Sequence, residues 1–349
     1  MNHQPSRFLL LLAISLLPAA CAAPHFQSVA ANPSTPTLYE DHALMDDGYR
    51  LPVAQWRPVG APQAVVLALH GFNDYHHAFA GIGEALVARG VMTYAYDQRG
   101  FGATAERGIW PGTERLVADA RAMVRLLRRT HPGIPFYLMG ESMGGAVAMV
   151  LLGQGTAPPV DGAVLIAPAV WARNTMPTLQ RLALWLGVRI MPAKTLSGEG
   201  LKIRASDNED MLRRLWEDPL VIRASRIDTL YGLSKLMDRA LAAAPRLTAR
   251  TLILYGMHDQ IIPKVPTCRM LTTLPADSRW RFALYPQGYH MLTRDLGGAL
   301  VLRDISAWLE DQQAALPSKA EVLRPRLAAL HNPHCKALWK KAVPPMPTH

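Results

Sequence analysis

Residues 140–144, which read Gly-Glu-Ser-Met-Gly, constrain the fold of this chain more than any other stretch. An apolar run at 134–139 precedes them, and small and apolar residues follow at 145–152. A buried strand, a tight turn and a helix fit that order, and in this context a Gly-x-Ser-x-Gly turn holds its serine hydroxyl above the edge of a sheet. The glycines leave room for neighbouring backbone, and the amino end of the helix favours developing negative charge. We therefore predict that Ser142 is a nucleophile.

Strands and helices alternate along much of the remaining chain. Strand-like runs at 38–45 and 51–56 flank Asp46-Asp47-Gly48, which predicts a hairpin. Continuous apolar runs predict strands buried on both faces, at 64–69, 91–96, 134–139, 162–167 and 251–255. Helical patterns lie at 78–89, 113–130 and 295–313, and a last strand is predicted at 279–285. The alternation predicts an α/β fold with a mostly parallel sheet flanked by helices.

The alternation breaks between residues 168 and 250, after the sixth predicted strand. This segment has a helical pattern and is dense in large apolar residues, among them Trp171, Met176, Leu179, Leu182, Leu184, Trp185, Leu186, Ile190, Met211, Trp216, Leu230, Leu233 and Met237. We predict that it forms a helical lid, at about 170–247, whose apolar lining binds a ligand. The alternative is that some of these apolar residues belong to the ordinary core between helices and do not line a ligand site.

Two further residues complete a set that can activate Ser142. A serine hydroxyl is a weak nucleophile and needs a general base, which in turn needs an acid to orient it. Asp259 follows the strand after the insertion and His290 follows the last strand, in the chain order serine, aspartate, histidine. Carboxyl ends of parallel strands share the sheet edge where ligands bind. We assign Ser142 as nucleophile, His290 as base and then acid, and Asp259 as the orienting carboxylate.

A tetrahedral intermediate on Ser142 would need two backbone N–H donors for its oxyanion. The amide of Met143 directly follows the nucleophile, and we predict that it is one of them. We predict the second donor to be the amide of Phe72, in the loop that follows the run 64–69. His258 neighbours Asp259, and its offset indicates a loop residue rather than the base.

The two ends of the chain differ in composition from its centre. Residues 1–23 have the positive start, short apolar core and small residues of an export signal. Within them, Leu-Pro-Ala-Ala-Cys at 17–21 resembles a bacterial lipobox with Cys21 as the lipidated residue, although Pro18 stands where leucine is usual. Cleavage after Ala22 is the alternative. We predict a linker at 24–37, a folded domain at 38–316 and a basic, proline-containing tail at 317–349.

The charge and the cysteine content of the chain limit which binding partners and which cysteine-based sites are to be expected. The net charge is +10, and part of it lies in the basic tail. Such a tail favours an acidic surface, most simply anionic lipid, and a solvated tail without a partner is the alternative. We expect no nucleic-acid partner. The cysteines, Cys21, Cys268 and Cys335, are far apart and lack CxxC spacing, so that neither a disulfide framework nor a metal site is indicated.

Six short motifs match one enzyme family in sequence and order. They are His70-Gly71-Phe72, Asp97-x-x-Gly100-x-Gly102, Gly140-Glu141-Ser142-Met143-Gly144-Gly145, Asp218-Pro219-Leu220, Gly256-x-x-Asp259 and Gly288-Tyr289-His290. With them, the chain from about Tyr39 to Leu316 resembles the monoacylglycerol lipase and lysophospholipase branch of the α/β-hydrolases, which is grouped with serine aminopeptidases. The chain departs from this branch at Glu141, where histidine is common. The resemblance implies hydrolysis of an acyl ester of glycerol or of a lysophospholipid, without a metal or other cofactor.

We therefore expect a serine ester hydrolase that acts on lipid-like esters at a membrane surface of the bacterial cell envelope. It would be either anchored through a lipid on Cys21 or free in the periplasm or medium. Leu184 and Trp185 of the insertion would contact the acyl chain. A peptidase of the same fold is one alternative, but it needs a polar anchor for the amino end of a peptide, and the apolar insertion argues against one. The second alternative is a binding protein without catalytic activity. The presence of all three residues Ser142, Asp259 and His290 argues against it.

Overall fold

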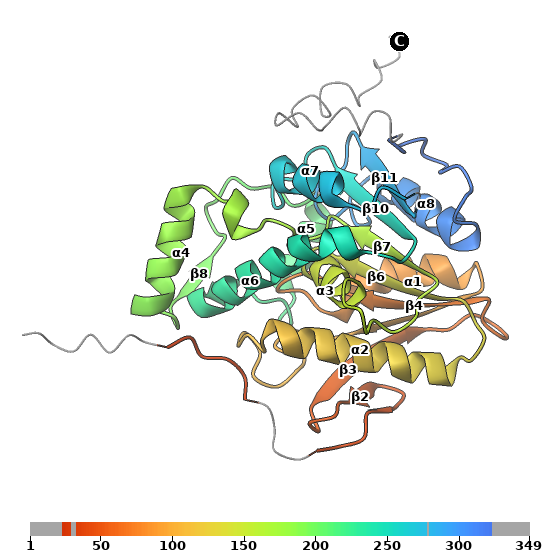
Figure 1. The fold of residues 1–349 in the computed structure, drawn as a ribbon, viewed down its shortest axis with the longest axis horizontal. Coiled ribbons are helices and arrows are strands. Elements are labelled where there is room, and N and C mark those ends of the chain that lie inside the picture. The colour runs from red at the N-terminus through yellow and green to blue at the C-terminus, as the bar shows by residue number, and fades with distance from the viewer. Residues whose placement is uncertain (1–22, 29–32, 278, 323–349) are drawn as a thin grey trace, which may run out of the picture.

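The fold was analysed in a computed structural model that describes residues 23–28, 33–277 and 279–322. Its centre is a nine-stranded sheet of order β1-β2-β3-β5-β4-β6-β7-β10-β11 (Figure 1). The first three strands pair antiparallel, and all pairs from β5 to β11 are parallel. The mostly parallel α/β sheet expected from the alternating sequence is therefore confirmed.

The strands of this sheet are β1 (Thr37–Leu38), β2 (His42–Leu44), β3 (Arg50–Trp56), β4 (Ala64–Leu69), β5 (Val91–Tyr96), β6 (Phe136–Glu141), β7 (Gly162–Ile166), β10 (Thr251–Gly256) and β11 (Trp280–Tyr285). The predicted hairpin is present, since β2 pairs with β3. The first predicted strand is divided into β1 and β2, which pair with each other because the chain turns between Tyr39 and His42.

Helices cover both faces of the sheet. They are η1 (His76–Phe79), α1 (Ala80–Val87), α2 (Thr113–Thr130), α3 (Met143–Leu152), α7 (Lys264–Thr273) and α8 (Gly298–Glu310). Side chains that alternate along β4 enter two separate cores, because successive residues of a strand point to opposite faces. Val65 and Leu67 join the core under α2, α3 and α7, whereas Val66 and Ala68 join the core under α1 and α8.

The insertion between β7 and β10 contains η2 (Arg173–Thr175), α4 (Thr178–Ile190), β8 (Thr195–Ser197), α5 (Glu209–Glu217), β9 (Ala224–Arg226), α6 (Ile227–Ala243) and η3 (Ala244–Arg246). Its helices differ in burial. α6 contacts α3 and places Leu236, Ala240 and Leu241 in the main core. α4 stands at one end of the molecule, at the left of Figure 1, and buries only Val188. Part of the insertion is thus core and part is exposed.

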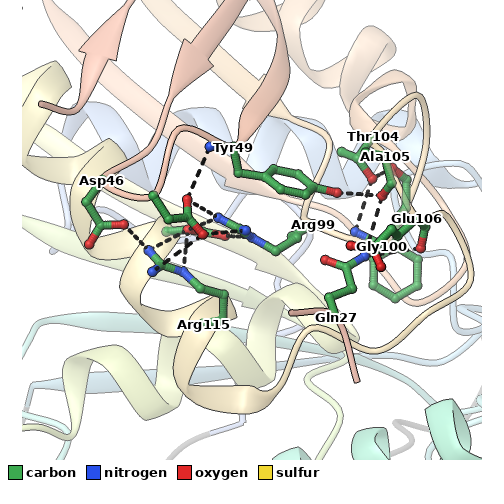
Figure 2. A network of polar contacts seen from close by, with 12 residues as sticks. Gln27, Asp46, Tyr49, Arg99, Gly100, Thr104, Ala105, Glu106 and Arg115 are labelled. Atoms are coloured by element: carbon green, nitrogen blue, oxygen red, sulfur yellow. Dashed lines mark hydrogen bonds and ion pairs between the residues drawn. The ribbon is translucent and has the colours of Figure 1, made fainter. Parts of the chain in front are cut away.

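A buried ionic network ties the loop after β5 to the rest of the sheet (Figure 2). The guanidinium of Arg99, which is 1% exposed, donates to both carboxylate oxygens of Asp47 at 2.7 and 2.9 Å and to both of Asp119 at 2.9 and 3.1 Å. Arg115 donates to Asp119 from the next turn of α2. The ring of Tyr49 lies 3.8 Å below the guanidinium. Arg99 thus joins the β2–β3 turn to α2.

Structure extends somewhat beyond the predicted domain boundaries of 38 and 316. In the predicted linker, Gln27 is buried, and its side-chain amide donates to the carbonyl of Glu106. After Leu316, the carboxylate of Glu321 accepts two hydrogen bonds from Arg281, and Val322 packs into a core. Cys268, in α7, is disulfide-bonded, which the wide spacing of the cysteines did not predict.

Candidate active site

Ser142 occupies a strained turn between β6 and α3. Its backbone angles are φ 51° and ψ −113°, a positive φ that non-glycine residues rarely adopt. The turn is tight because its flanking glycines touch backbone. A Cβ on Gly140 would lie 2.5 Å from the carbonyl carbon of Gly144, and a Cβ on Gly144 would lie 1.9 Å from the carbonyl oxygen of Leu69. Glycine is thus required at both positions, as the motif indicated.

Asp259 and His290 meet at the same edge of the sheet. They follow β10 and β11, are 6% and 5% exposed, and join through a hydrogen bond of 2.8 Å from Nδ1 of the imidazole to Oδ2 of the carboxylate. Ser142 and His290 line one pocket. The backbone N–H groups of His290 and Met291 both donate to the carbonyl of Ala205, so the insertion holds the histidine loop in place.

The environment of His290 favours its charged form. Burial alone would lower its pKa, but the negative charge and the hydrogen bond of Asp259 more than offset burial and raise the pKa above the usual value. Two other buried carboxylates, Asp228 and Asp295, bind Arg226 and Ser206 respectively. Asp259 is therefore the carboxylate that orients this imidazole.

The raised pKa of His290 predicts the acid limb of the pH profile. A general base must be neutral, so that kcat/KM should fall as the pH drops through a pKa above that of a free imidazole, about 6.5. In Asp259→Asn, the charge of Asp259 no longer offsets the lowering of the pKa of His290 by burial. The acid limb should therefore move to lower pH, and the rate should fall. The exposed neighbour His258 provides the control, since His258→Gln should leave the limb in place. An unshifted limb in Asp259→Asn would contradict the pairing. The measurement is kcat/KM of a soluble ester between pH 4 and 9.

The two predicted oxyanion donors are the residue that follows Ser142 and a residue that lines the pocket of Ser142. Met143 is the first residue of α3, where an amide has no acceptor within the helix. Phe72 lines the pocket beside Gly71. The loop that carries Phe72 is held by His70, whose Nδ1 donates to the carbonyl of Gly71 at 2.7 Å and whose Nε2 accepts from the amide of Gln98 at 2.8 Å. Burial lowers the pKa of His70, which keeps the ring neutral for this bridging role.

The pocket around Ser142 has a volume of about 450 Å³ and two chemically different parts. One part is apolar and is built mainly by the insertion, with Trp171, Met176, Leu184, Leu230, Leu233, Met237, Ile261 and Ile262. The other part is polar and contains Asp74, Glu141 and Arg294. Three larger pockets, of about 1000, 800 and 530 Å³, contain none of Ser142, Asp259 and His290. Of the two residues predicted to contact an acyl chain, only Leu184 lines the pocket with Ser142, whereas Trp185 faces away from it.

Sequence reasoning missed the polar part of the pocket. Arg294 donates to Asp74 and to Glu141, both at 2.8 Å, and one buried carboxylate oxygen of Glu141 has no protein partner among the described residues. The hydroxyl of Tyr75 donates to Asp218 at 2.6 Å, which joins the oxyanion loop to the insertion. No local pattern signals these contacts, because the paired residues are far apart in the chain.

Comparison with known proteins identifies the family. The model of the family described as serine aminopeptidase, S33, matches residues 60–297, which contain all three proposed catalytic residues. The chain belongs to this family. Within the α/β-hydrolases it falls in the monoacylglycerol lipase-like branch and is a hydrolase of the lipase and esterase type.

Several relatives of this S33-family chain are named as lipases. It is 28% identical over 285 residues to a monoglyceride lipase of Mus musculus, covering 79% of this chain and 93% of the relative. It is also 28% identical over 270 residues to a monoacylglycerol lipase of Mycolicibacterium smegmatis, covering 75% and 93%. Among solved structures, a soluble variant of a monoglyceride lipase of Saccharomyces cerevisiae shares the fold with a TM-score of 0.66 at 19% identity, over 84% of this chain and all of that one.

Proposed function

We propose that this chain is a serine ester hydrolase that cleaves acyl esters of glycerol or of lysophospholipids through an acyl-enzyme on Ser142. The observation that carries the proposal is the hydrogen-bonded pair of Asp259 and His290 beside a strained Ser142, in one pocket with an apolar and a polar part. The names of the relatives support the lipid ester as substrate.

In the proposed mechanism, His290 takes the proton of Ser142 as its Oγ attacks the ester carbonyl. The negative charge that develops on the carbonyl oxygen is stabilised by the amides of Phe72 and Met143. When the C–O bond to the alcohol breaks, His290 gives its proton to the leaving oxygen. Water then attacks the acyl-enzyme with His290 again as base, and releases the acid. Asp259 keeps the imidazole in the required tautomer and stabilises its charged form.

The division of the pocket supports an acyl ester of a polar alcohol. The apolar part under the insertion suits an acyl chain, because each methylene group buried there is worth about 0.8 kcal/mol. The polar part suits the alcohol, because Asp74, Glu141 and Arg294 offer hydrogen-bond acceptors and donors to hydroxyl groups.

Leu184 should control the preference for long acyl chains. Leu184→Asp places a charge in the apolar part of the pocket, and we expect it to lower kcat/KM for long-chain p-nitrophenyl esters by at least about tenfold relative to the acetate ester. Trp185→Asp is the matched control in the same helix, since Trp185 does not line this pocket and the ratio should stay unchanged. Equal losses on both esters in Leu184→Asp would indicate misfolding and contradict acyl binding here.

An aminopeptidase is the second candidate, and one observation favours it. Asp74 and Glu141 place two carboxylates in the pocket, where a peptide amino end could bind. Arg294 is bonded to both, and its positive charge at this place disfavours an ammonium group beside it. A panel of p-nitrophenyl esters of increasing chain length beside aminoacyl anilides separates the two functions. We expect hydrolysis of the esters, and turnover of the anilides alone would overturn the proposal.

We further propose that the enzyme works at a membrane surface, with α4 against the lipid. Large apolar side chains of this helix are exposed, with Leu179 at 78%, Ile190 at 59% and Leu186 at 47%. Arg189 on the same helix would attract anionic head groups. The proposed contact is interfacial, with the apolar face of α4 in the head-group region. Among the described residues, no helix is both long and apolar enough to cross a bilayer.

Removing the exposed apolar side chains should weaken membrane binding. Leu179→Ser, Leu186→Ser and Ile190→Ser together should lower binding to phosphatidylglycerol-containing vesicles by at least about tenfold, because each apolar side chain moved out of water contributes about 1.5–3 kcal/mol. Val59→Ser is the control, since Val59 is fully exposed in the loop between β3 and β4. The measurement is vesicle co-sedimentation in a Cys21→Ser background. Unchanged binding of the triple variant would contradict the proposed surface.

Export to the cell envelope remains a prediction, since Cys21 and the tail from 323 lie outside the described residues. Labelled palmitate incorporated by the natural sequence but not by Cys21→Ser would support lipidation. An unlabelled protein that begins at Ala23 would overturn it.

A further inference from the structure

A second pocket, of about 800 Å³, lies beside the candidate active site and is lined by a different face of α4. Three helices line this pocket, each with one face, because the lining residues of each helix are mostly three or four positions apart. The lining residues are Thr178, Arg181, Leu182 and Trp185 of α4, Asp238, Leu241 and Ala242 of α6, and Arg269 and Thr273 of α7. Leu184 lines both pockets, so a single layer of side chains separates them there.

The charge of this pocket is positive. Arg173 donates to Asp238 at 2.5 Å, so that the carboxylate of Asp238 is already paired with a cation. Arg181 and Arg269 also line the pocket, and neither guanidinium has a carboxylate partner among the residues that the structure describes. Two guanidinium groups are therefore free to bind an anion. A guanidinium binds a carboxylate or phosphate through two parallel N–H···O bonds, which makes such a group the matching ligand.

Much of the remaining lining is apolar. Leu241 is 7% exposed, and Leu182 and Trp185 are about half exposed along the wall formed by α4. An apolar wall beside unpaired cations fits an amphipathic anion with a single hydrocarbon chain. The volume of the pocket lies within the range of about 300–1,000 Å³ that is usual for small-molecule sites.

We propose that this pocket binds a long-chain carboxylate, the acid that the active site releases. The identity of the ligand as a product rests on the proposed function, whereas the site itself rests on its own lining. The carboxylate binds Arg181 and Arg269, and the hydrocarbon chain lies along Leu182, Trp185 and Leu241. Because Leu184 borders both pockets, the acid is held next to the place where it forms but outside the pocket that contains Ser142.

A photoreactive fatty acid tests this site. The full chain with Ser142→Ala is incubated with a diazirine-bearing long-chain fatty acid, irradiated and digested with trypsin. We expect adducts in peptides 240–246 and 270–279, which carry lining residues of this pocket and none of the active-site pocket. Unlabelled oleate should compete, and neutral monoolein should not. Labelling confined to peptides of the active-site pocket, or equal competition by monoolein, would overturn the proposal.

Matched arginine variants locate the anion. Arg269→Gln also removes a trypsin site, so that peptide 265–279 takes the place of 270–279 in the variant digest. Arg181→Gln with Arg269→Gln should reduce labelling of peptides 240–246 and 265–279 at least about tenfold. Arg125→Gln, on the exposed face of α2, should not. Both side chains of the double variant are exposed, so that its circular dichroism and melting should match those of the parent. Undiminished labelling in the double variant would refute the site.

The result is independent of hydrolysis, because the labelled protein lacks the proposed nucleophile. Turnover of the natural sequence is measured separately. An active esterase without labelling here would overturn the second site alone, and labelling here in a chain without esterase activity would overturn the proposed function alone.

Discussion

Ser142→Ala should remove turnover and leave the fold intact. We expect kcat/KM for p-nitrophenyl esters to fall by about 10⁴-fold or more, because no other group can form the acyl-enzyme. The fold should survive, because the strained turn is set by the contacts of Gly140 and Gly144 and not by the serine hydroxyl. Fluorophosphonate labelling should disappear with the activity.

A second serine in the same pocket provides the control for this variant. Ser234 lines the pocket from α6, but its hydroxyl donates to the carbonyl of Tyr231 in its own helix. Ser234→Ala should keep both turnover and labelling. His290→Ala should be nearly as severe as Ser142→Ala, and Asp259→Asn should cost less, because a carboxylate that orients the base does not itself react. Substantial turnover by Ser142→Ala would refute the assignment of the nucleophile.

Arg99→Met should cause the largest loss of stability of any single change in the network of Figure 2. The substitution leaves the buried carboxylates of Asp47 and Asp119 without their shared cation. Arg115 still binds Asp119, whereas Asp47 loses both of its short ionic hydrogen bonds. Removing one partner of a buried ion pair costs about 3–5 kcal/mol, because a buried charge is left behind. This is a large share of a total stability of about 5–15 kcal/mol. The measurement is the free energy of unfolding in urea at pH 7.

Two further variants test the cause of this loss. Arg57→Met is the control, because Arg57 is an exposed arginine, and its removal should change the free energy of unfolding by no more than about 0.5 kcal/mol. Adding Asp47→Asn and Asp119→Asn to Arg99→Met should recover part of the loss, because the uncompensated charges are then removed. A loss below about 1 kcal/mol in Arg99→Met would contradict the network as a stabilising element.

Local sequence patterns were sufficient to predict the main features of the sheet and the elbow. A strand buried on both faces must be apolar throughout, so β4, β5, β6, β7 and β10 appear as continuous apolar runs. Gly140 and Gly144 are visible because a turn this close to other backbone excludes side chains. The chain order of Ser142, Asp259 and His290 is visible because each follows a strand end, and parallel strands bring those ends to one edge.

The same patterns could not show what faces the pocket. Leu184 and Trp185 are adjacent apolar residues in one helix, and only the packing of α4 against α6 decides that Leu184 lines the pocket with Ser142 while Trp185 faces the second pocket. The contacts of the loop 97–102 were likewise not visible in its motif. Its residue Gln98 binds His70, and Arg99 ties the loop to α2.

The polar part of the pocket was decided by tertiary structure alone. Arg294 binds Asp74 and Glu141, which lie 220 and 153 residues earlier in the chain, and the carbonyl of Ala205 holds the histidine loop from within the insertion. Periodicity reports which face of an element is buried, because burial depends on the apolar character of neighbours along one helix or strand. It carries no information about which polar groups from distant elements meet. That depends on how the insertion packs over the carboxyl edge of the sheet, where a buried charge must find a partner wherever the fold brings one.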